Sequence, residues 1–210
     1  LEPNTSSEAE MLDKFYSEAT TGVTYNMGWW PQEDTGVCYA TKNGVATIPS
    51  DYFENMTVYM AGSKELDFPE VPAKPELENK IYVALAFSDG DNTQYNEHTM
   101  RMRWSSSLRQ KYPISWTITP ALYYCAPQML NYYYKTAGNS TLIGGPSGMG
   151  YTKTTRWRYK DGFLNKYAAA TNKMLELTGI NIVTMWDRIS EGTYSDFAFK
   201  TNALLGASIN

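Results

Sequence analysis

A regular alternation of apolar runs and helical patterns, which begins at residue 81, constrains the fold of this 210-residue chain more than any other feature. Ile81–Phe87 is almost continuously apolar, as is typical of a parallel strand that is buried on both faces. The strongest helical pattern covers residues 163–178, and Gly179 ends it. A strand, a helix and a second strand in succession specify a parallel sheet with right-handed crossovers. We therefore predict an α/β fold.

The predicted sheet is a parallel, barrel-like (β/α) arrangement. Its strands are expected near residues 24–28, 57–60, 81–87, 114–118, 141–143 and 180–186. Too few strand–helix units are visible for a closed eight-stranded barrel, so we expect an open, irregular or incomplete one. Further strand-like runs lie at 37–41 and 45–48, and a final helix is expected over 197–205.

Residues 64–80 are rich in proline and charge, which predicts an extended connector on the surface. The segment that precedes them is too short to bury a core of its own. We therefore expect residues 1–210 to form a single domain. We also expect this domain to be a portion of a longer protein, next to a flanking domain.

Charge and residue counts exclude several functions. The chain has 18 basic and 22 acidic side chains, a formal net charge of −4 and a pI near 5.1, which argues against nucleic-acid binding. No apolar run is long enough to span a membrane. With one histidine, His98, the chain cannot build a three-histidine metal site. The spacing of Cys38 and Cys125 leaves open whether they form a disulfide or two isolated thiols.

Acidic and aromatic side chains follow the predicted strands, at the edge where functional groups gather in parallel α/β folds. These side chains are Trp29, Trp30, Glu33, Asp34, Asp89, Asp91, Asn92, Ser147, Tyr151, Trp186 and Asp187. Hydrolysis of a glycosidic bond needs one carboxylic acid, one base or nucleophile, and apolar faces for the sugar rings. The composition fits such a site, since the chain has 17 tyrosines, seven phenylalanines and six tryptophans.

Asp89 and Asp91 flank Gly90 directly after the apolar run. Two carboxylates held close together cannot both ionise freely, so one pKa should be raised unless a cation or nearby amides offset the repulsion. The same segment is also typical of a turn in which Asn92 caps a helix. A Ca²⁺ or Mg²⁺ ion at Asp89 and Asp91 is a further alternative, and otherwise we expect no cofactor.

The other candidates have structural alternatives. His98 lies six residues beyond Asn92 on a predicted helix, where a surface position is favoured over the role of a catalytic base. Ser147 lacks the GxSxG pattern of a hydrolase elbow, and its glycine-rich loop lacks the lysine of a phosphate-binding loop. Trp29 and Trp30 suit the core as well as a ligand platform.

Four blocks of sequence stand in a distinctive order. They are FSDGDNTQYNEH (87–98), PISWTITPAL (113–122), AP-x-x-L-x-YYY (126–134) and GPSGMGY (145–151). Together with the GWWPQED segment before them, they resemble the C-terminal domain of the GxGYxYP family, which is described as a family of glycoside hydrolases. The motif in the family name is only partly matched, because Lys153 and Thr154 stand where the family has Tyr and Pro.

The resemblance implies a secreted or cell-surface enzyme that hydrolyses glycosidic bonds in oligo- or polysaccharides. The alternatives are a non-catalytic glycan-binding module and a divergent deacetylase-like barrel with a metal at the acidic cluster. For hydrolysis we assign catalytic roles to Asp89, Asp91, Asp187 and Glu33. Substrate binding is assigned to Trp29, Trp30, Asn92, His98, Trp116, Ser147 and Tyr151, with Trp104 as an alternative ring platform.

Overall fold

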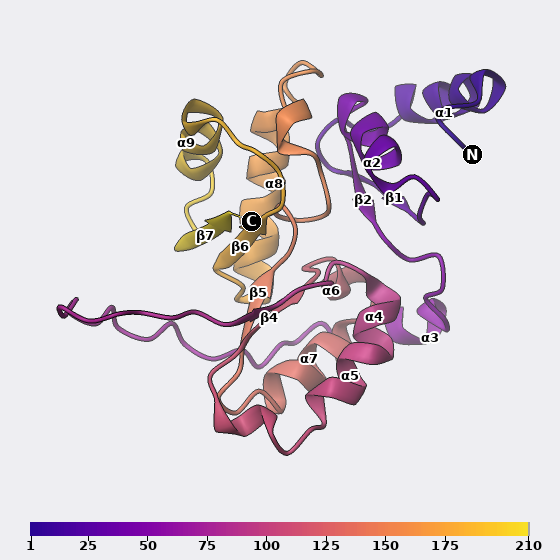
Figure 1. The fold of residues 1–210 in the computed structure, drawn as a ribbon. Coiled ribbons are helices and arrows are strands. Elements are labelled where there is room, and N and C mark those ends of the chain that lie inside the picture. Colours follow the sequence, from indigo (N-terminus) through magenta and orange to yellow (C-terminus); the bar gives the residue numbers. More distant parts are fainter. Residues whose placement is uncertain (210) are drawn as a thin grey trace.

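The computed structural model describes residues 1–209, whose strands form two parallel sheets (Figure 1). The smaller sheet pairs β1 (Thr24–Met27) with β2 (Val45–Ile48). The larger sheet has the order β3 (Ala86–Phe87), β4 (Ser115–Ile118), β5 (Thr141–Gly144), β6 (Ile182–Met185) and β7 (Gly206–Ile209). Its neighbours are parallel throughout and follow chain order, so the sheet curls into an open, incomplete half-barrel. The predicted α/β fold with a parallel, barrel-like sheet is confirmed.

The first helix precedes β1, and the other helices lie between consecutive strands along the chain. They are α1 (Ser6–Ser17), α2 (Glu33–Lys42), α3 (Met56–Met60), α4 (Thr93–Glu97), α5 (Thr99–Trp104), α6 (Leu122–Cys125), α7 (Pro127–Lys135), α8 (Phe163–Thr178) and α9 (Glu191–Phe199). The helix predicted over 163–178 is confirmed as α8, and it ends where Gly179 adopts a φ of +70°. Among the residues described, no helix is both long and apolar enough to cross a membrane.

Aromatic side chains fill the centre of the main core. Trp104 of α5 meets Trp116 of β4 and Tyr133 of α7 edge to face, with ring centroids 5.3 and 5.0 Å apart. Tyr167 of α8 and Phe197 of α9 pack together on another part of the same core. Much of the aromatic content therefore stabilises the fold and is not available to a ligand.

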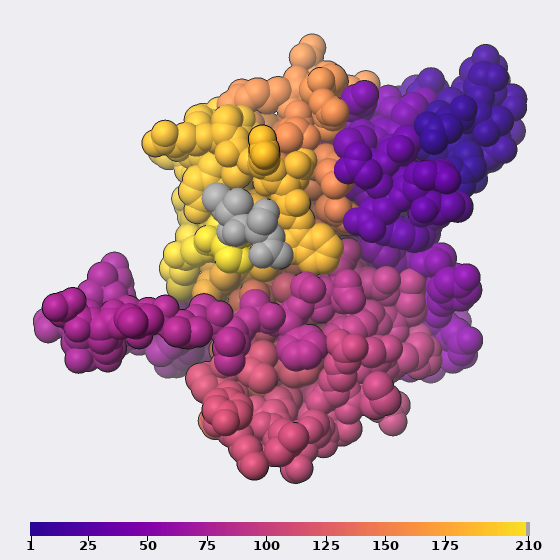
Figure 2. Space-filling model, viewed as in Figure 1, coloured from indigo at the N-terminus to yellow at the C-terminus, as the bar shows by residue number. Residues whose placement is uncertain are grey.

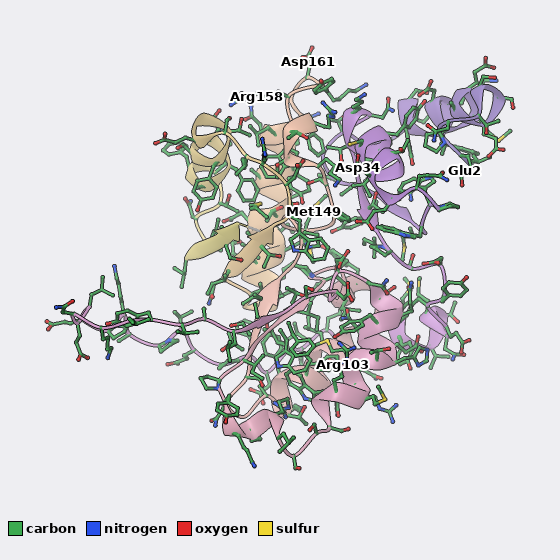
Figure 3. The ribbon with its side chains drawn as sticks, viewed as in Figure 1. Glu2, Asp34, Arg103, Met149, Arg158 and Asp161 are labelled. Atoms are coloured by element: carbon green, nitrogen blue, oxygen red, sulfur yellow. The ribbon has the colours of Figure 1, made fainter. Side chains whose placement is uncertain are left out.

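The loop after β5 joins the two sheets. Thr47 of β2 and Tyr151 form an antiparallel bridge, in which each amide donates to the other carbonyl at 2.8 Å. The hydroxyl of Tyr25, from β1, donates to the carbonyl of Met149 at 3.2 Å. Lys153, after the same loop, pairs with Asp34 of α2, which Figure 3 labels together with Met149 of the loop. The carboxyl ends of both sheets therefore lie around one loop.

Two short segments that the sequence predicts as strands are helical. Residues 37–41 belong to α2, which buries Val37, Ala40 and Thr41 on one face and has acidic residues in its first turn. Residues 57–60 belong to α3, which follows Asn55 in the left-handed conformation at a φ of +54°. The β-branched residues in both segments favour strands only weakly, so helix packing and turn geometry decide the local structure.

The apolar run 81–87 differs from its prediction as a strand covered on both faces. Only Ala86 and Phe87 pair with β4, while Ile81 is 92% and Val83 78% exposed. Residues 63–80 before them contain no helix or strand, and Figure 2 shows this part of the chain standing away from the body of the molecule. The prediction of burial is wrong because none of the described elements covers this segment.

The C-terminal region also departs from its prediction. The last helix, α9, spans Glu191–Phe199, whereas a helix was expected over 197–205. Ser190 begins it by accepting a hydrogen bond from the amide of Thr193, and the chain then returns to the sheet as β7. Cys38 and Cys125 are both free thiols, which answers the question that their spacing left open.

Candidate active site

The turn after β3 is built around Gly90. The amide of Gly90 donates to the hydroxyl of Thr117 at 2.8 Å, and that hydroxyl donates to the carbonyl of Phe87 at 3.1 Å. Asp89 adopts a φ of +77°, which is unusual for a residue with a side chain. The turn is therefore fixed against β4, with Asp89 exposed and Asp91 buried.

Asp91 has the most perturbed carboxyl group of this region. Its residue is 5% exposed, and burial raises the pKa of its carboxyl to about 7, with smaller increases from the charges of Asp89 and Glu33. A hydrogen bond from its own backbone amide opposes this shift. The prediction that one carboxyl of the Asp89–Asp91 pair has a raised pKa is confirmed, but its main cause is burial and not repulsion.

Glu33 is the second carboxyl group of this region, and it follows β1 along the chain. It is exposed in the first turn of α2, and its Oε1 accepts a hydrogen bond of 3.0 Å from the hydroxyl of Tyr151. Burial raises the pKa of Tyr151, so its hydroxyl stays protonated and can donate. The charge of Glu33 acts on Asp91, which places the two carboxyl groups in one electrostatic environment.

Aromatic rings flank Tyr151 on two sides. Trp29, after β1, stacks on it at a centroid distance of 6.2 Å, and Trp186, after β6, meets it edge to face at 5.7 Å. The indole Nε1 of Trp186 is buried and has no hydrogen-bond partner among the described residues. The sequence did not assign Trp186 to substrate binding, although its position at a strand end is the signal that identifies it.

Lys153 is a second residue that the sequence did not assign to the site. Its ammonium group lies 5.5 Å from the centre of the Tyr151 ring and 2.8 Å from Oδ1 of Asp34. It also stands where the related motif has Tyr, so the departure from the motif introduces a charge beside Tyr151. The hydrogen bond from Lys153 is the main reason that the pKa of Asp34 is lowered.

Replacing Lys153 with methionine is expected to destabilise the protein by less than about 1 kcal/mol at pH 7. The loss is small because the Asp34 side chain is 80% exposed, so water screens the ion pair even though the Lys153 side chain is 13% exposed. A carboxyl with a lowered pKa stabilises the fold above its unfolded pKa, and this stabilisation is lost as the pH falls through the lowered pKa, so the variant and the parent should converge in acid, once Asp34 is protonated in both. Thermal melts at neutral and at acidic pH measure this, and a loss of several kcal/mol would contradict a surface ion pair.

Several other predicted site residues have local structural contacts. Asn92 caps α4 by accepting the amide of Tyr95 at 2.9 Å, as the capping alternative expects. The hydroxyl of Ser147 is buried and donates to the carbonyl of Thr152. Asp187 accepts hydrogen bonds from the hydroxyl of Thr155 and the amide of Arg188, at 2.8 and 2.9 Å.

The remaining candidates are three tryptophans in the core clusters and one exposed histidine. Trp30 is buried against Gly36 in the smaller core cluster. Trp104 and Trp116 pack in the main core, and Phe87 stacks on Trp116 at 4.6 Å. His98 is exposed at the junction of α4 and α5. The charges of Asp89 and Glu33 act on Asp91, and Tyr151 contacts both Glu33 and Trp29, so these five residues form a linked series.

The described residues contain no group of three or more His, Cys, Asp or Glu side chains arranged to hold a metal ion. Asp89 and Asp91, which the sequence suggests as ligands for a cation, therefore lack a third such side chain among the described residues.

Two family descriptions match the chain. One is the GxGYxYP putative glycoside hydrolase C-terminal domain, over residues 79–207, and the other is the GxGYxYP third domain, over residues 1–61. The chain belongs to the GxGYxYP family. The resemblance seen in the four sequence blocks is confirmed. Residues 62–78, between the two matched regions of this GxGYxYP protein, contain no helix or strand.

The fold is also similar to a solved structure, that of a putative hydrolase from Bacteroides thetaiotaomicron, with a TM-score of 0.86 at 23% sequence identity. The match covers 99% of this chain and 42% of that chain. The GxGYxYP chain thus spans less than half the length of the protein that it resembles, and the similarity establishes the shared fold. No curated protein matches the chain.

Proposed function

We propose that the protein is a glycoside hydrolase in which Asp91 is the general acid and Glu33 is the second carboxylate. The proposal rests above all on the pKa of Asp91, which is raised to about 7. A carboxyl group that holds its proton near neutral pH can donate it to the oxygen of a departing sugar. The description of the family, which names glycoside hydrolysis, supports the same reaction class.

In this reaction Asp91 donates its proton to the glycosidic oxygen as the carbon–oxygen bond breaks. The carboxylate of Glu33 stabilises the positive charge that develops on the sugar ring, and Tyr151 orients that carboxylate through its hydrogen bond. One water molecule supplies the new hydroxyl group of the product, and its second proton restores Asp91. The charge of Asp89 helps to keep Asp91 protonated.

The proposed substrate is an oligo- or polysaccharide. Trp29 and Trp186 are half-buried, so part of each ring is accessible to the apolar face of a sugar. Lys153 adds a donor 5.5 Å from the centre of the Tyr151 ring, which both tryptophans contact. Because polymeric glycans are found outside cells, we propose a secreted or cell-surface location.

The test is a screen of the whole protein against chromogenic glycosides and polysaccharides. Hydrolysis of at least one substrate is expected, with kcat/KM falling above about pH 7 as Asp91 loses its proton. Reducing-end assays and thin-layer chromatography identify the products. An inactive protein would count against the proposed hydrolase. A pH dependence of kcat/KM that Asp91→Asn leaves unchanged in shape would count against Asp91 as the general acid.

A second candidate, a non-catalytic glycan-binding module, is favoured by one observation. Asp91 is 5% exposed, which leaves little of its carboxyl group open to a substrate. Binding of oligosaccharides without turnover, retained after Asp91→Asn and lost after Trp29→Ala, would support this candidate. Turnover that disappears in Asp91→Asn while binding persists supports the hydrolase.

A further inference from the structure

A cavity of about 390 Å³ lies between α3, α4, α5 and α7, apart from the strand ends. Its buried lining consists of Asn96, Glu97 and Tyr133. Its exposed rim includes Arg101 and Tyr132. The cavity therefore has a polar floor beneath an aromatic wall, and a cation stands at its mouth. Its volume is that of a site for a small molecule.

The floor offers one carboxylate acceptor, that of Glu97, which the fold uses only in part. The side chain of Glu97 is 7% exposed and accepts the amide of Glu54 at 3.2 Å, while Nε2 of His98 lies 3.5 Å away. The residue Asn96 is fully buried, and its Oδ1 has no hydrogen-bond partner among the residues described. The exposed part of the Glu97 carboxylate can accept hydrogen bonds from a ligand that brings donors and positive charge, while Asn96 lies beneath the cavity surface.

The rim offers the opposite charge. Arg101 follows Glu97 by four positions, and within residues 1–209 it takes part in no ion pair. Its guanidinium can donate two parallel hydrogen bonds to a carboxylate. Tyr132 beside it is exposed, and Met129 also lines the cavity, so the space between floor and rim is largely apolar.

We propose that this cavity binds a free α-amino acid with an apolar side chain. The ammonium group lies on the floor, where the Glu97 carboxylate accepts its hydrogen bonds and the tyrosine rings add cation–π attraction. The carboxylate pairs with Arg101 at the rim, and the apolar side chain packs against Tyr132 and Met129. An ammonium suits the floor better than a sugar hydroxyl because only the ammonium neutralises the buried charge of Glu97.

The experiment is a calorimetric titration of the protein with L-leucine and L-methionine. Two analogues of leucine serve as probes, namely isoamylamine, which lacks the carboxylate, and 4-methylvalerate, which lacks the ammonium group. Saturable binding of at least one amino acid is expected, and the bound amino acid should raise the melting temperature of the protein. Each analogue should bind at least tenfold more weakly than leucine, because each loses one charged contact.

Variants locate the binding. Arg101→Met and Glu97→Gln should each lower the affinity for the amino acid at least tenfold. Glu97→Gln keeps an acceptor for the amide of Glu54. The matched control is Arg103→Met on the same helix, where Arg103 (labelled in Figure 3) lies over the ring of Phe87 at 5.4 Å. This control should bind as the parent does.

Three results would overturn the proposal. The first is no binding by either amino acid to the folded parent. The second is isoamylamine binding as tightly as leucine, which would leave Arg101 without a role. The third is glucose binding that Arg101→Met does not change, which would identify the cavity as a polyol site. None of these results depends on Asp91 or on hydrolysis.

Discussion

Replacing Asp91 with asparagine is expected to lower the turnover of the proposed hydrolase by about 10²- to 10⁴-fold, because an amide cannot supply the proton that the leaving sugar needs. The loss should lie in kcat, since the amide keeps the shape of the side chain. Steady-state kinetics on the best substrate from the glycoside screen measure it. Asp196→Asn, the same chemical change at an exposed residue of α9, is the control and should leave turnover unchanged.

Two further variants assign the second carboxylate. Glu33→Gln should also remove most of the turnover, since the charge of Glu33 stabilises the developing cation. Asp187→Asn should have a smaller effect, because its carboxylate is already engaged by Thr155 and the amide of Arg188. If Asp187→Asn abolishes turnover and Glu33→Gln does not, the roles of the two carboxylates are reversed from those proposed here.

The same Asp91 variant has a stability readout that does not require a substrate. The carboxyl of Asp91 has a pKa of about 7 in the folded protein and about 4 in the unfolded chain. Its contribution to the free energy of unfolding is therefore highest below pH 4, and this contribution falls as the pH rises from there through 7. The parent should therefore melt at a lower temperature at pH 8 than at pH 5. Asp91→Asn should reduce this difference, because the amide has no charge to bury.

The larger features of the fold follow from sequence pattern, and the smaller ones depend on tertiary partners. The run 163–178 forms α8 because its apolar stripe is long enough for its period to be unmistakable. The segment 57–60 is too short for that, and it becomes helical after the left-handed Asn55. Ile81 shows a different limit, since an apolar pattern predicts burial only where another part of the chain can cover it.

The candidate site shows the same division. Strand ends identify Glu33, Asp91 and Tyr151 as residues of one edge, because parallel strands place their carboxyl ends together. They do not identify Trp116, which lies within β4 and packs in the core against Phe87. The antiparallel bridge between Thr47 and Tyr151 is also absent from any local pattern, yet it is this bridge that holds Tyr151 close to α2.

The second large effect is expected from Gly90→Ala, which should destabilise the fold by about 3 kcal/mol or more through overpacking and the loss of a buried hydrogen bond. A Cβ atom on Gly90 would lie 1.6 Å from the backbone oxygen of Thr117. Backbone cannot rotate aside as a side chain can, so the turn must move away from β4 and release the hydroxyl of Thr117. Chemical denaturation of both proteins measures the difference.

Gly192→Ala is the matched control for this change. Gly192 lies in α9 with no atom within 4 Å of the position of a new Cβ, so alanine should stabilise the helix by about 0.5–1 kcal/mol. The opposite signs of the two substitutions separate crowding at one turn from a general response to alanine. Because Asp89 and Asp91 flank Gly90, its displacement should also move both carboxyl groups. The Gly90→Ala protein should therefore lose turnover even at temperatures where it is still folded, and full activity in a folded variant would show that the turn does not position Asp91.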